Sequence, residues 1–159
     1  MNGDDLRLTS SSVDATEAAA ARLSARLRPG DLIALDGPLG AGKTVFVRGL
    51  AVGLGVDAAV VKSPTFVLHH VYGSPPRLHH LDLYRLGPGA RIQLLDLDSL
   101  LESAPAAVEW AGCADLEPWH PLGLVIEIAG DQVRSIEARE PERAPARLID
   151  AWRAAVAGR

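Results

Sequence analysis

The chain has 159 residues, 48% of them hydrophobic and 23% charged, a globular composition and a length that fits one domain over residues 1–159. Its formal net charge of −4 at pH 7 provides no basic surface for independent binding of DNA or RNA. The single cysteine, Cys113, excludes an internal disulfide and leaves no set of thiols for a zinc site.

The N-terminal segment predicts a cytoplasmic protein whose first long element is a helix. The chain begins with the acidic segment Met1–Asp5 and no long apolar run follows, so we expect neither a signal peptide nor a membrane-spanning helix. Asp14 and Glu17 have capping-box spacing, and an apolar stripe behind them predicts a helix over Val13–Arg28. Asp31–Asp36 is then a short apolar run suited to a strand buried on both faces.

A glycine-rich segment follows this strand and matches the pattern GxxxxGK[ST] in full: Gly37, Pro38, Leu39, Gly40, Ala41, Gly42, Lys43 and Thr44. In such a loop the backbone amides form an anion-binding nest, and the next helix adds the positive end of its dipole. Pro38 has no amide, but it precedes the amides that do most of the binding. The segment therefore predicts a P-loop that holds ATP, with Lys43 on the outer phosphates and the Thr44 hydroxyl on Mg²⁺.

The rest of the chain predicts an alternation of helices and strands. The helix after Thr44 has apolar residues at helical spacing and is expected to end at Gly55. The remaining patterns predict strands at 65–72 and 78–84 that form a hairpin, one or two short helices within 91–103, a strand at 106–110, a second hairpin of 122–128 and 133–138, and a C-terminal helix around Trp152.

Two acids lie at or near the ends of predicted strands, where a P-loop protein needs carboxylates to hold magnesium and to orient water. Asp82 falls late in its strand, where it either serves the nucleotide or only caps a turn. Glu109 closes a very apolar strand, a position that solvation alone explains poorly. Both residues are candidates for the magnesium-side acid, and the residues themselves favour Glu109 slightly.

Two further segments admit more than one interpretation. Ser63-Pro64-Thr65-Phe66 occupies the place of a mobile segment that senses the terminal phosphate in other P-loop proteins, but it is equally a turn at the entrance of a strand. The pairs at residues 69–70 and 79–80 are histidines, which invite a zinc hypothesis. Neighbouring residues on a strand face opposite sides, so each pair offers one imidazole to a shared site, and we favour the absence of zinc.

Four motifs occur in one order: GPLGAGKT, VKSPTF, HHLDLYRL and VEW. Together they closely resemble the TsaE (YjeE) family over about Asp31 to Trp110, the small ATPases needed to make threonylcarbamoyladenosine in tRNA. The resemblance implies an α/β, P-loop NTPase-like three-layer fold with a mixed central sheet. It also implies ATP and Mg²⁺ as cofactors, TsaB and TsaD as partner proteins, tRNA contact only through their complex, and hydrolysis that supports multiple turnovers of the transferase.

The resemblance also assigns roles to single residues. Carried over by position, Lys43 and the loop amides bind phosphates, and Thr44 and Glu109 resemble the magnesium-side residues. Asp82 resembles an acid close to the phosphates and their water, so Asp82 and Glu109 are the expected catalytic residues. Thr65 resembles the switch-side residue that contacts nucleotide.

The chain departs from the family pattern at two places. The family usually has an acid where Pro38 stands, and a proline-containing stretch where this chain has Ala111–Asp115. These departures leave the contacts at the edge of the nucleotide open. Arg134 is expected to match a nucleotide-contacting arginine near the C-terminal hairpin.

Three other functions compete with this hypothesis. A small-molecule kinase uses the same loop, but such enzymes usually carry a basic lid, and the arginines here are scattered. A guanine-nucleotide switch commonly uses an NKxD element, and the only asparagine is Asn2. A nucleotide-stabilised scaffold remains open if both acids serve only to bind magnesium. We expect weak intrinsic hydrolysis, because no arginine finger is evident in the chain and such a group contributes ~10³ to 10⁵ in rate.

Overall fold

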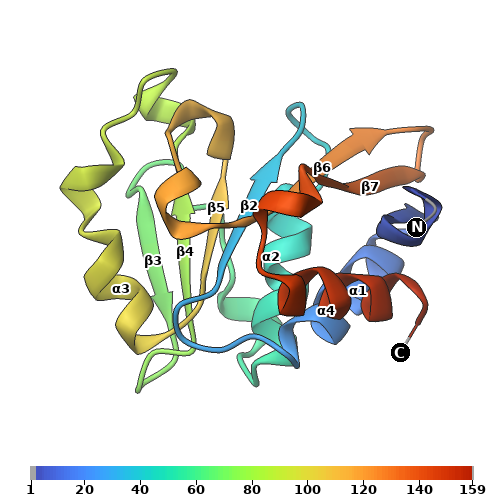
Figure 1. Cartoon of the computed structure of the whole chain (residues 1–159), viewed down its shortest axis with the longest axis horizontal. Coiled ribbons are helices and arrows are strands. Elements are labelled where there is room, and N and C mark those ends of the chain that lie inside the picture. Colours follow the sequence, from blue (N-terminus) through green and yellow to red (C-terminus); the bar gives the residue numbers. More distant parts are fainter. Residues whose placement is uncertain (1–2, 159) are drawn as a thin grey trace.

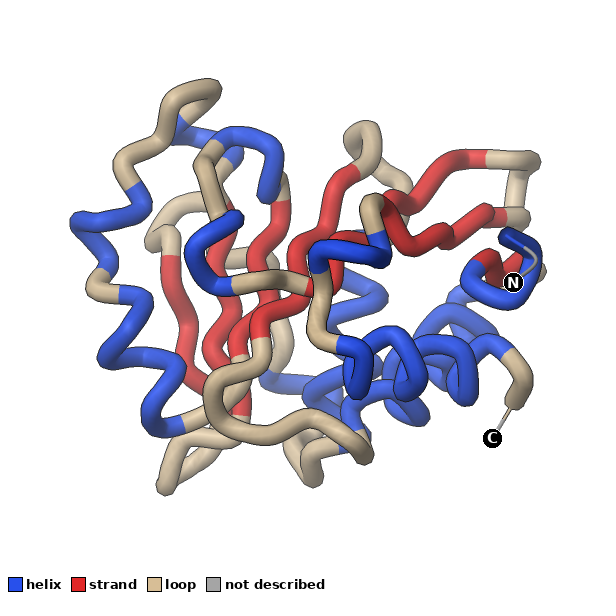
Figure 2. Tube along the Cα trace, in the orientation of Figure 1, coloured by secondary structure: helices blue, strands red, loops and turns tan. Residues whose placement is uncertain are grey.

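Seven strands form one mixed sheet in the order β1-β7-β6-β2-β5-β4-β3, within residues 3–158, which the computed structural model describes. The strands are β1 (Arg7–Ser10), β2 (Leu32–Asp36), β3 (His69–Tyr72), β4 (Leu78–Asp82), β5 (Ala106–Glu109), β6 (Leu122–Ile128) and β7 (Arg134–Arg139). β6, β2, β5 and β4 are parallel, and β1, β7 and β3 add antiparallel pairings on the two flanks. Figure 2 shows these strands crossing the middle of the molecule between helices.

Helices cover both faces of the sheet. The α-helices are α1 (Val13–Ser24), α2 (Lys43–Gly53), α3 (Leu97–Ser103) and α4 (Ala146–Val156). Figure 1 shows α1, α2 and α4 gathered together, with α3 at the opposite side of the molecule beside β3 and β4. No helix within the described residues is long and apolar enough to cross a bilayer. This arrangement confirms the predicted three-layer α/β fold with a mixed central sheet.

Short 3-10 helices join these elements. They are η1 (Gly3–Leu6), η2 (Ala58–Val60), η3 (Tyr84–Leu86), η4 (Ile92–Leu95), η5 (Ala111–Cys113), η6 (Glu117–Trp119) and η7 (Pro141–Arg143). Together η4 and α3 confirm the short helices that were expected within residues 91–103.

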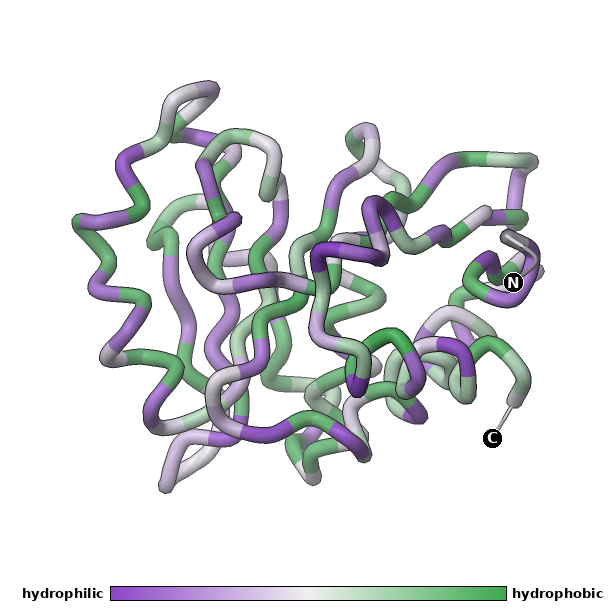
Figure 3. Tube along the Cα trace, in the orientation of Figure 1, coloured by the Kyte–Doolittle hydropathy of each residue, from purple (hydrophilic) through white to green (hydrophobic). Residues whose placement is uncertain are grey.

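Strand β2 separates two apolar layers, because successive side chains on a strand point to opposite faces. Ile33 and Leu35 join the cluster formed with α1, α2 and α4, whereas Leu32 and Ala34 join the cluster formed with α3. All four side chains are buried, which confirms the expected doubly buried strand. In Figure 3 the Cα trace through α3 alternates between hydrophilic and hydrophobic residues, as expected for a helix with one face on the core.

Helix α4 closes the first layer through Trp152. This side chain is fully buried, and its ring centroid lies 6.0 Å from that of Phe46 on α2. Its indole Nε1 donates a hydrogen bond to the Leu6 carbonyl oxygen at 2.8 Å. Truncating a buried tryptophan typically costs about 3–5 kcal/mol, so this contact holds both ends of the described chain against α2.

The first helix begins differently from its prediction. Ser12 is its N-cap, and the Ser12 hydroxyl oxygen accepts a hydrogen bond from the Ala15 amide at 3.0 Å. The capping box assigned to Asp14 and Glu17 is therefore wrong. Glu17 instead forms an ion pair with Arg48 on α2 at 3.0 Å, a contact between elements that local spacing does not reveal.

Helix ends follow from local hydrogen bonds. α1 ends at Ser24 and not at Arg28, since the Arg28 amide donates to the Asp31 carboxylate at 2.8 Å and turns the chain toward β2. α2 ends at Gly53, and Gly55 follows with a φ of 84°, a left-handed conformation that suits glycine after a helix. The predicted stop at Gly55 therefore lies just beyond the helix.

The predicted strand at residues 65–72 is only half present. β3 begins at His69, and residues 65–68 form a turn in which the Leu68 amide donates to the Pro64 carbonyl at 2.6 Å. Leu68 has a φ of 67°, so the backbone cannot continue as a strand there. The turn interpretation of this segment is confirmed, and its early strand is wrong.

The other predicted strands are present and differ from their predictions only in where they end, and the sheet contains one further strand, β1. β4 stops at Asp82, two positions before the predicted end at Tyr84, because the Asp82 carboxylate accepts the Tyr84 amide at 2.9 Å. β5 stops at Glu109, since Trp110 has a φ of 55°. β1 was not predicted, because it is short and mostly exposed, and its pairing with β7 is a long-range contact. The second hairpin and the C-terminal helix are confirmed.

Candidate functional site

The predicted P-loop connects the carboxyl end of β2 to the first residue of α2. Gly42 caps α2 with a φ of 105°, a conformation that a side chain would strain. A Cβ atom at Gly37 would overlap the carbonyl oxygen of Ile126 on the neighbouring strand. The glycines of the motif are thus required by backbone geometry, and the loop turns tightly over the sheet edge.

Lys43 lies folded against this loop. Its side chain is buried, and Nζ donates to the carbonyl oxygens of Gly37 at 2.6 Å and Pro38 at 3.0 Å. The ammonium also lies 4.1 Å from the centre of the Trp110 ring, a cation–π contact. Lys43 is therefore already in the loop and surrounded by acceptors that an anion would replace.

Burial sets the electrostatics of this ammonium group. Desolvation lowers the pKa of Lys43 below its usual value of 10.5, and the negative charges of Glu109, Asp36 and Asp82 oppose that shift. The net direction is downward, so removal of the group from water outweighs the three carboxylates. A phosphate at the loop would supply further compensating charge.

Thr44 and Glu109 meet directly. The Thr44 hydroxyl donates a hydrogen bond to the Glu109 carboxylate Oε1 at 2.6 Å, joining the first turn of α2 to the end of β5. Glu109 is only 2% exposed, which is unusual for a carboxylate and indicates that its surroundings hold it there. Both oxygens are hard donors of the kind that Mg²⁺ prefers.

Asp82 lies beside Glu109, because the register of β4 and β5 places the two residues opposite each other. Its Oδ2 accepts hydrogen bonds from the hydroxyls of Thr65 at 2.8 Å and Ser63 at 3.2 Å, and the side chain is buried. The predicted switch segment is thus attached to this acid. Sequence reasoning named Thr65 but missed Ser63, which the same motif contains.

Arg134 contacts the loop from β7. Its guanidinium donates to the carbonyl oxygens of Ala41 at 3.0 Å and Gly40 at 3.3 Å, and also to that of Val133 at 3.0 Å. These bonds brace the loop backbone, and the expected contact with nucleotide remains a prediction. Leu39, at the tip of the loop, is 78% exposed.

Sequence reasoning overlooked two residues near the loop. Asp36 ends β2, and its Oδ1 accepts the Gly112 amide at 2.9 Å, which ties the segment after β5 to the loop. Its position at a strand end is the same signal that identified Glu109. His80 is fully buried with Nε2 at 3.4 Å from Glu109 Oε1, and its place on the same face of β4 as Asp82 was the available signal.

The histidine pairs form contacts without a metal cluster. His69 Nε2 lies 3.0 Å from His79 Nδ1, and His79 Nε2 lies 2.8 Å from the Ser103 hydroxyl. Burial lowers the pKa of both His69 and His79, which favours neutral rings. No group of three or more His, Cys, Asp or Glu side chains that could hold a metal ion occurs among residues 3–158.

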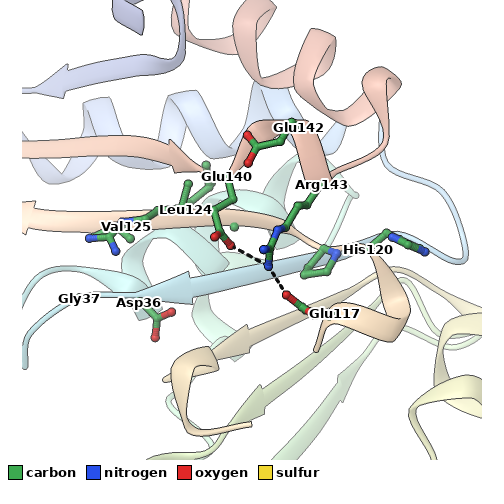
Figure 4. A pocket seen from close by; sticks show the side chains of 12 residues that line it. Asp36, Gly37, Glu117, His120, Leu124, Val125, Glu140, Glu142 and Arg143 are labelled. Atoms are coloured by element: carbon green, nitrogen blue, oxygen red, sulfur yellow. Dashed lines mark hydrogen bonds and ion pairs between the residues drawn. The ribbon is translucent and has the colours of Figure 1, made fainter. Parts of the chain in front are cut away.

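A separate open cleft of about 990 Å³ lies next to Gly37, between β6 and the segments that carry Glu117 and Arg143. Figure 4 shows Arg143 between Glu117 and Glu140, with an ion pair to each. The cleft reaches the loop through Asp36 and Gly37 only. It is therefore distinct from the site around Lys43.

The residues around the loop fit Mg-ATP. The first backbone hydrogen bond of α2 runs from the Phe46 amide to the Gly42 carbonyl oxygen at 2.9 Å, so the amides of Lys43, Thr44 and Val45 before it can donate to an anion at this point. A Cβ at Gly40 would find no described atom within 4 Å, so the space above the loop is open. The Thr44 hydroxyl and the Glu109 carboxylate place oxygens beside it that would suit magnesium.

Comparison with known proteins gives one family. Residues 10–139 match the family model described as "Threonylcarbamoyl adenosine biosynthesis protein TsaE". A tRNA threonylcarbamoyladenosine biosynthesis protein TsaE from Streptomyces coelicolor is 50% identical over 117 residues, which cover 71% of this chain and 72% of the relative. The protein of that name from Bacillus subtilis is 40% identical over 125 residues, 76% of this chain and 77% of the relative.

The fold agrees with that comparison. The crystal structure of YdiB from Bacillus subtilis superposes with a TM-score of 0.65 and 34% sequence identity, covering 84% of this chain and 83% of that one. The match to the family model spans the loop, both acids and β7.

Proposed function

We propose that this chain, which belongs to the TsaE family of threonylcarbamoyladenosine biosynthesis proteins, binds and hydrolyses Mg-ATP in the modification of tRNA. The observation that carries the proposal is the 2.6 Å hydrogen bond from Thr44 to Glu109, directly beside the buried ammonium of Lys43. A hydroxyl and an ammonium at the start of a helix, with a carboxylate beside them, are the groups that binding of a nucleoside triphosphate with magnesium requires.

Each residue has a distinct task in this proposal. Lys43 would exchange the carbonyl oxygens of Gly37 and Pro38 for the outer phosphates, and Thr44 and Glu109 would hold magnesium. Bound magnesium supplies positive charge that stabilises the leaving phosphate oxygens.

The second acid and the switch segment act on the water side. Asp82 accepts a proton or a hydrogen bond from the attacking water. Thr65, bonded to Asp82 at 2.8 Å, ties that acid to the segment of Ser63–Phe66. A shift of this segment when the terminal phosphate is present would therefore move Asp82, which gives the site a way to report its nucleotide state.

The proposal includes TsaB and TsaD as partners, with tRNA reached through their complex. Apolar side chains are exposed on the segments that bear the site residues: Phe66 is 83% exposed, Leu39 78% and Tyr84 51%. The nearby cations are engaged elsewhere, with Arg85 over the Phe66 ring at 5.4 Å and Arg134 on the loop carbonyls. A positive charge supplied by a partner would raise hydrolysis by ~10³-fold or more.

The test is ATP turnover by the wild-type chain, Glu109→Ala and the control Glu102→Ala, each alone and with purified TsaB, TsaD and substrate tRNA. Glu102 is an exposed acid on α3, remote from the loop. We expect partner-stimulated turnover in wild type and control, and a decrease of about 10²- to 10³-fold in Glu109→Ala. Threonylcarbamoyladenosine formed over several turnovers should decrease with it.

Two outcomes would contradict the proposal. Wild-type turnover that partners leave unchanged, together with unaffected tRNA modification, would leave a nucleotide-stabilised scaffold. Transfer of the terminal phosphate to a small molecule, detected as a labelled product, would instead establish a kinase.

A further inference from the structure

His80 lies in a buried row of polar groups between Lys62, next to the switch segment, and Glu109. Its side chain is fully buried in β4, on the face that carries Asp82. Its Nδ1 lies 2.8 Å from the Tyr72 hydroxyl, which also lies 3.1 Å from the carbonyl oxygen of Lys62. On the other side of the ring, Nε2 lies 3.4 Å from Glu109 Oε1.

The positions of the protons follow from the donors and acceptors along this row. Tyr72 has one hydroxyl proton, and of its two neighbours His80 Nδ1 is the nearer, at 2.8 Å against 3.1 Å for the Lys62 carbonyl oxygen. When Tyr72 donates to Nδ1, the single proton of a neutral imidazole is on Nε2. Nε2 faces a carboxylate, without a hydrogen bond of normal geometry.

An unpaired polar atom in such a place is costly, typically about 1–3 kcal/mol. A bare lone pair on Nε2 would also face the negative oxygen of Glu109 and repel it. Both problems disappear when one proton lies between Nε2 and Oε1, because the imidazole then donates to the carboxylate that Thr44 also contacts.

We propose that His80 is a positioning residue for Glu109: its Nε2–H holds the carboxylate on the sheet side, so that the carboxylate remains turned toward Thr44 and the loop. Tyr72 fixes the ring and its proton. This inference rests on the proposed function, because that function gives Glu109 its role at magnesium. It also connects Lys62, next to the switch segment, to Glu109 by a route separate from the contact between Thr65 and Asp82.

Two substitutions at His80 separate this role from simple packing. In His80→Gln, the amide nitrogen reaches the place of Nε2 and can donate to Glu109. In His80→Asn, the shorter amide reaches the place of Nδ1 and can pair with Tyr72 alone. If His80 positions Glu109, the glutamine variant should keep the gain in ATP affinity from Mg²⁺ and the asparagine variant should lose it. If His80 only holds Tyr72 in the core, the asparagine variant should keep the gain and the glutamine variant should lose it.

The measurement is the dissociation constant of ATP by calorimetry, with excess Mg²⁺ and with excess chelator, for wild type and both variants. We expect the gain in affinity from Mg²⁺ to fall about 10-fold or more in His80→Asn, the size typical of groups that orient a metal ligand. His80→Gln should keep it within about 3-fold, and affinity without Mg²⁺ should stay unchanged in both variants. An unchanged gain in His80→Asn, or an equal loss in both variants, would overturn the inference.

A second measurement needs no nucleotide and no new core residue at position 80. In wild-type protein labelled with ¹⁵N-histidine, the ring of His80 should show a proton on Nε2 and none on Nδ1. A ring without a proton on Nε2 in wild type would also overturn the inference. If wild type fails to bind Mg-ATP at all, the proposed function is wrong, and this spectrum still decides the contact between His80 and Glu109.

Discussion

The two ends of α2 are built on opposite principles. At its start, Lys43 and Thr44 meet Glu109 in a buried polar site whose hydrogen bonds cross between a helix, a loop and a strand. At its far end, Gly49 and Gly53 bring the helix so close to the backbone and small side chains of α1 that neither position has room for a Cβ atom. The start of the helix therefore gathers charged side chains, and its far end has glycines where it lies against α1.

The difference teaches how a small domain holds a costly site in place. Buried charges and unpaired polar atoms weaken a fold, and a compact apolar contact elsewhere offsets that cost. The close approach of α1 and α2 fixes the axis of α2, so the first turn of the helix is held where the loop needs it. Substitutions at the far end should therefore change stability, and substitutions at the start should change function more than stability.

The largest expected effect is at the packed end. A Cβ at Gly49 would overlap the Glu17 carbonyl oxygen and lie 2.7 Å from the Ala20 Cβ, so the two helices would have to separate. Alanine is the better helix former by about 1 kcal/mol, yet we expect Gly49→Ala to lower the free energy of unfolding by about 3 kcal/mol. Urea denaturation followed by circular dichroism measures this.

The matched control for that variant is Val52→Ala, on the exposed side of the same helix. It should change the free energy of unfolding by less than about 0.5 kcal/mol. Equal stability of Gly49→Ala and wild type would mean that α1 and α2 are not held in close contact, and the comparison between the two ends of α2 would fail.

A smaller effect is expected at the switch segment. Thr65→Val keeps the side-chain shape but removes the hydroxyl that donates to Asp82, so we expect a loss of about 1 kcal/mol in the free energy of unfolding. Ser63 also donates to Asp82 and limits that loss. Adding Ser63→Ala should cost more in the Thr65→Val background than in wild type, because Asp82 then has neither hydroxyl.

Thr9→Val, at an exposed position on the edge strand β1, is the control for Thr65→Val. Strict additivity of the two changes at residues 63 and 65 in a double-mutant cycle would show that the hydroxyls do not share Asp82. Denaturant titration of the four proteins of that cycle gives the coupling directly.

The smallest effect is a pH dependence at Lys43. Its folded-state pKa is lowered by burial, so the unfolded chain binds more protons in the range between that pKa and 10.5. Lys43 therefore weakens the fold at pH 7, and this cost is relieved as the pH rises through the folded-state pKa toward 10.5. Relative to Lys43→Met, which has no ammonium, wild type should gain stability between pH 7 and pH 10.

The comparison between wild type and Lys43→Met cancels other groups that titrate in that range, and the readout is the difference in free energy of unfolding at the two pH values. We expect a gain of at most about 1 kcal/mol, since three carboxylates oppose the desolvation. A difference that shrinks with rising pH would mean that the folded state raises this pKa, and that attraction by the carboxylates prevails over burial.

Local pattern in the sequence was enough to predict the loop and the elements around it. The segment Gly37–Thr44 requires a strand before it and a helix after it, and both are present. Apolar runs likewise predicted β2, β5 and β6, because each is formed by a continuous stretch of chain whose burial is visible in its own residues. The order of four motifs then identified the family.

Tertiary structure alone decided how the site residues pair. The sequence named both Asp82 and Glu109 and favoured Glu109 slightly as the magnesium-side acid, and the parallel pairing of β4 and β5 places the two acids side by side. In the folded chain the Thr44 hydroxyl donates to Glu109, and the Thr65 hydroxyl donates to Asp82. The role of each acid in hydrolysis stays a prediction.

The sequence failed where partners are distant along the chain. The apolar residues within 65–68 fit a strand pattern and predicted a strand. The turn that forms there instead depends on a distant partner, because Thr65 donates a hydrogen bond to Asp82. β1 has too few buried residues to be seen alone and exists through its pairing with β7. Periodicity and turn chemistry act over a few residues, whereas hydrogen bonds across a sheet depend on which strands become neighbours, and only the folded chain determines that.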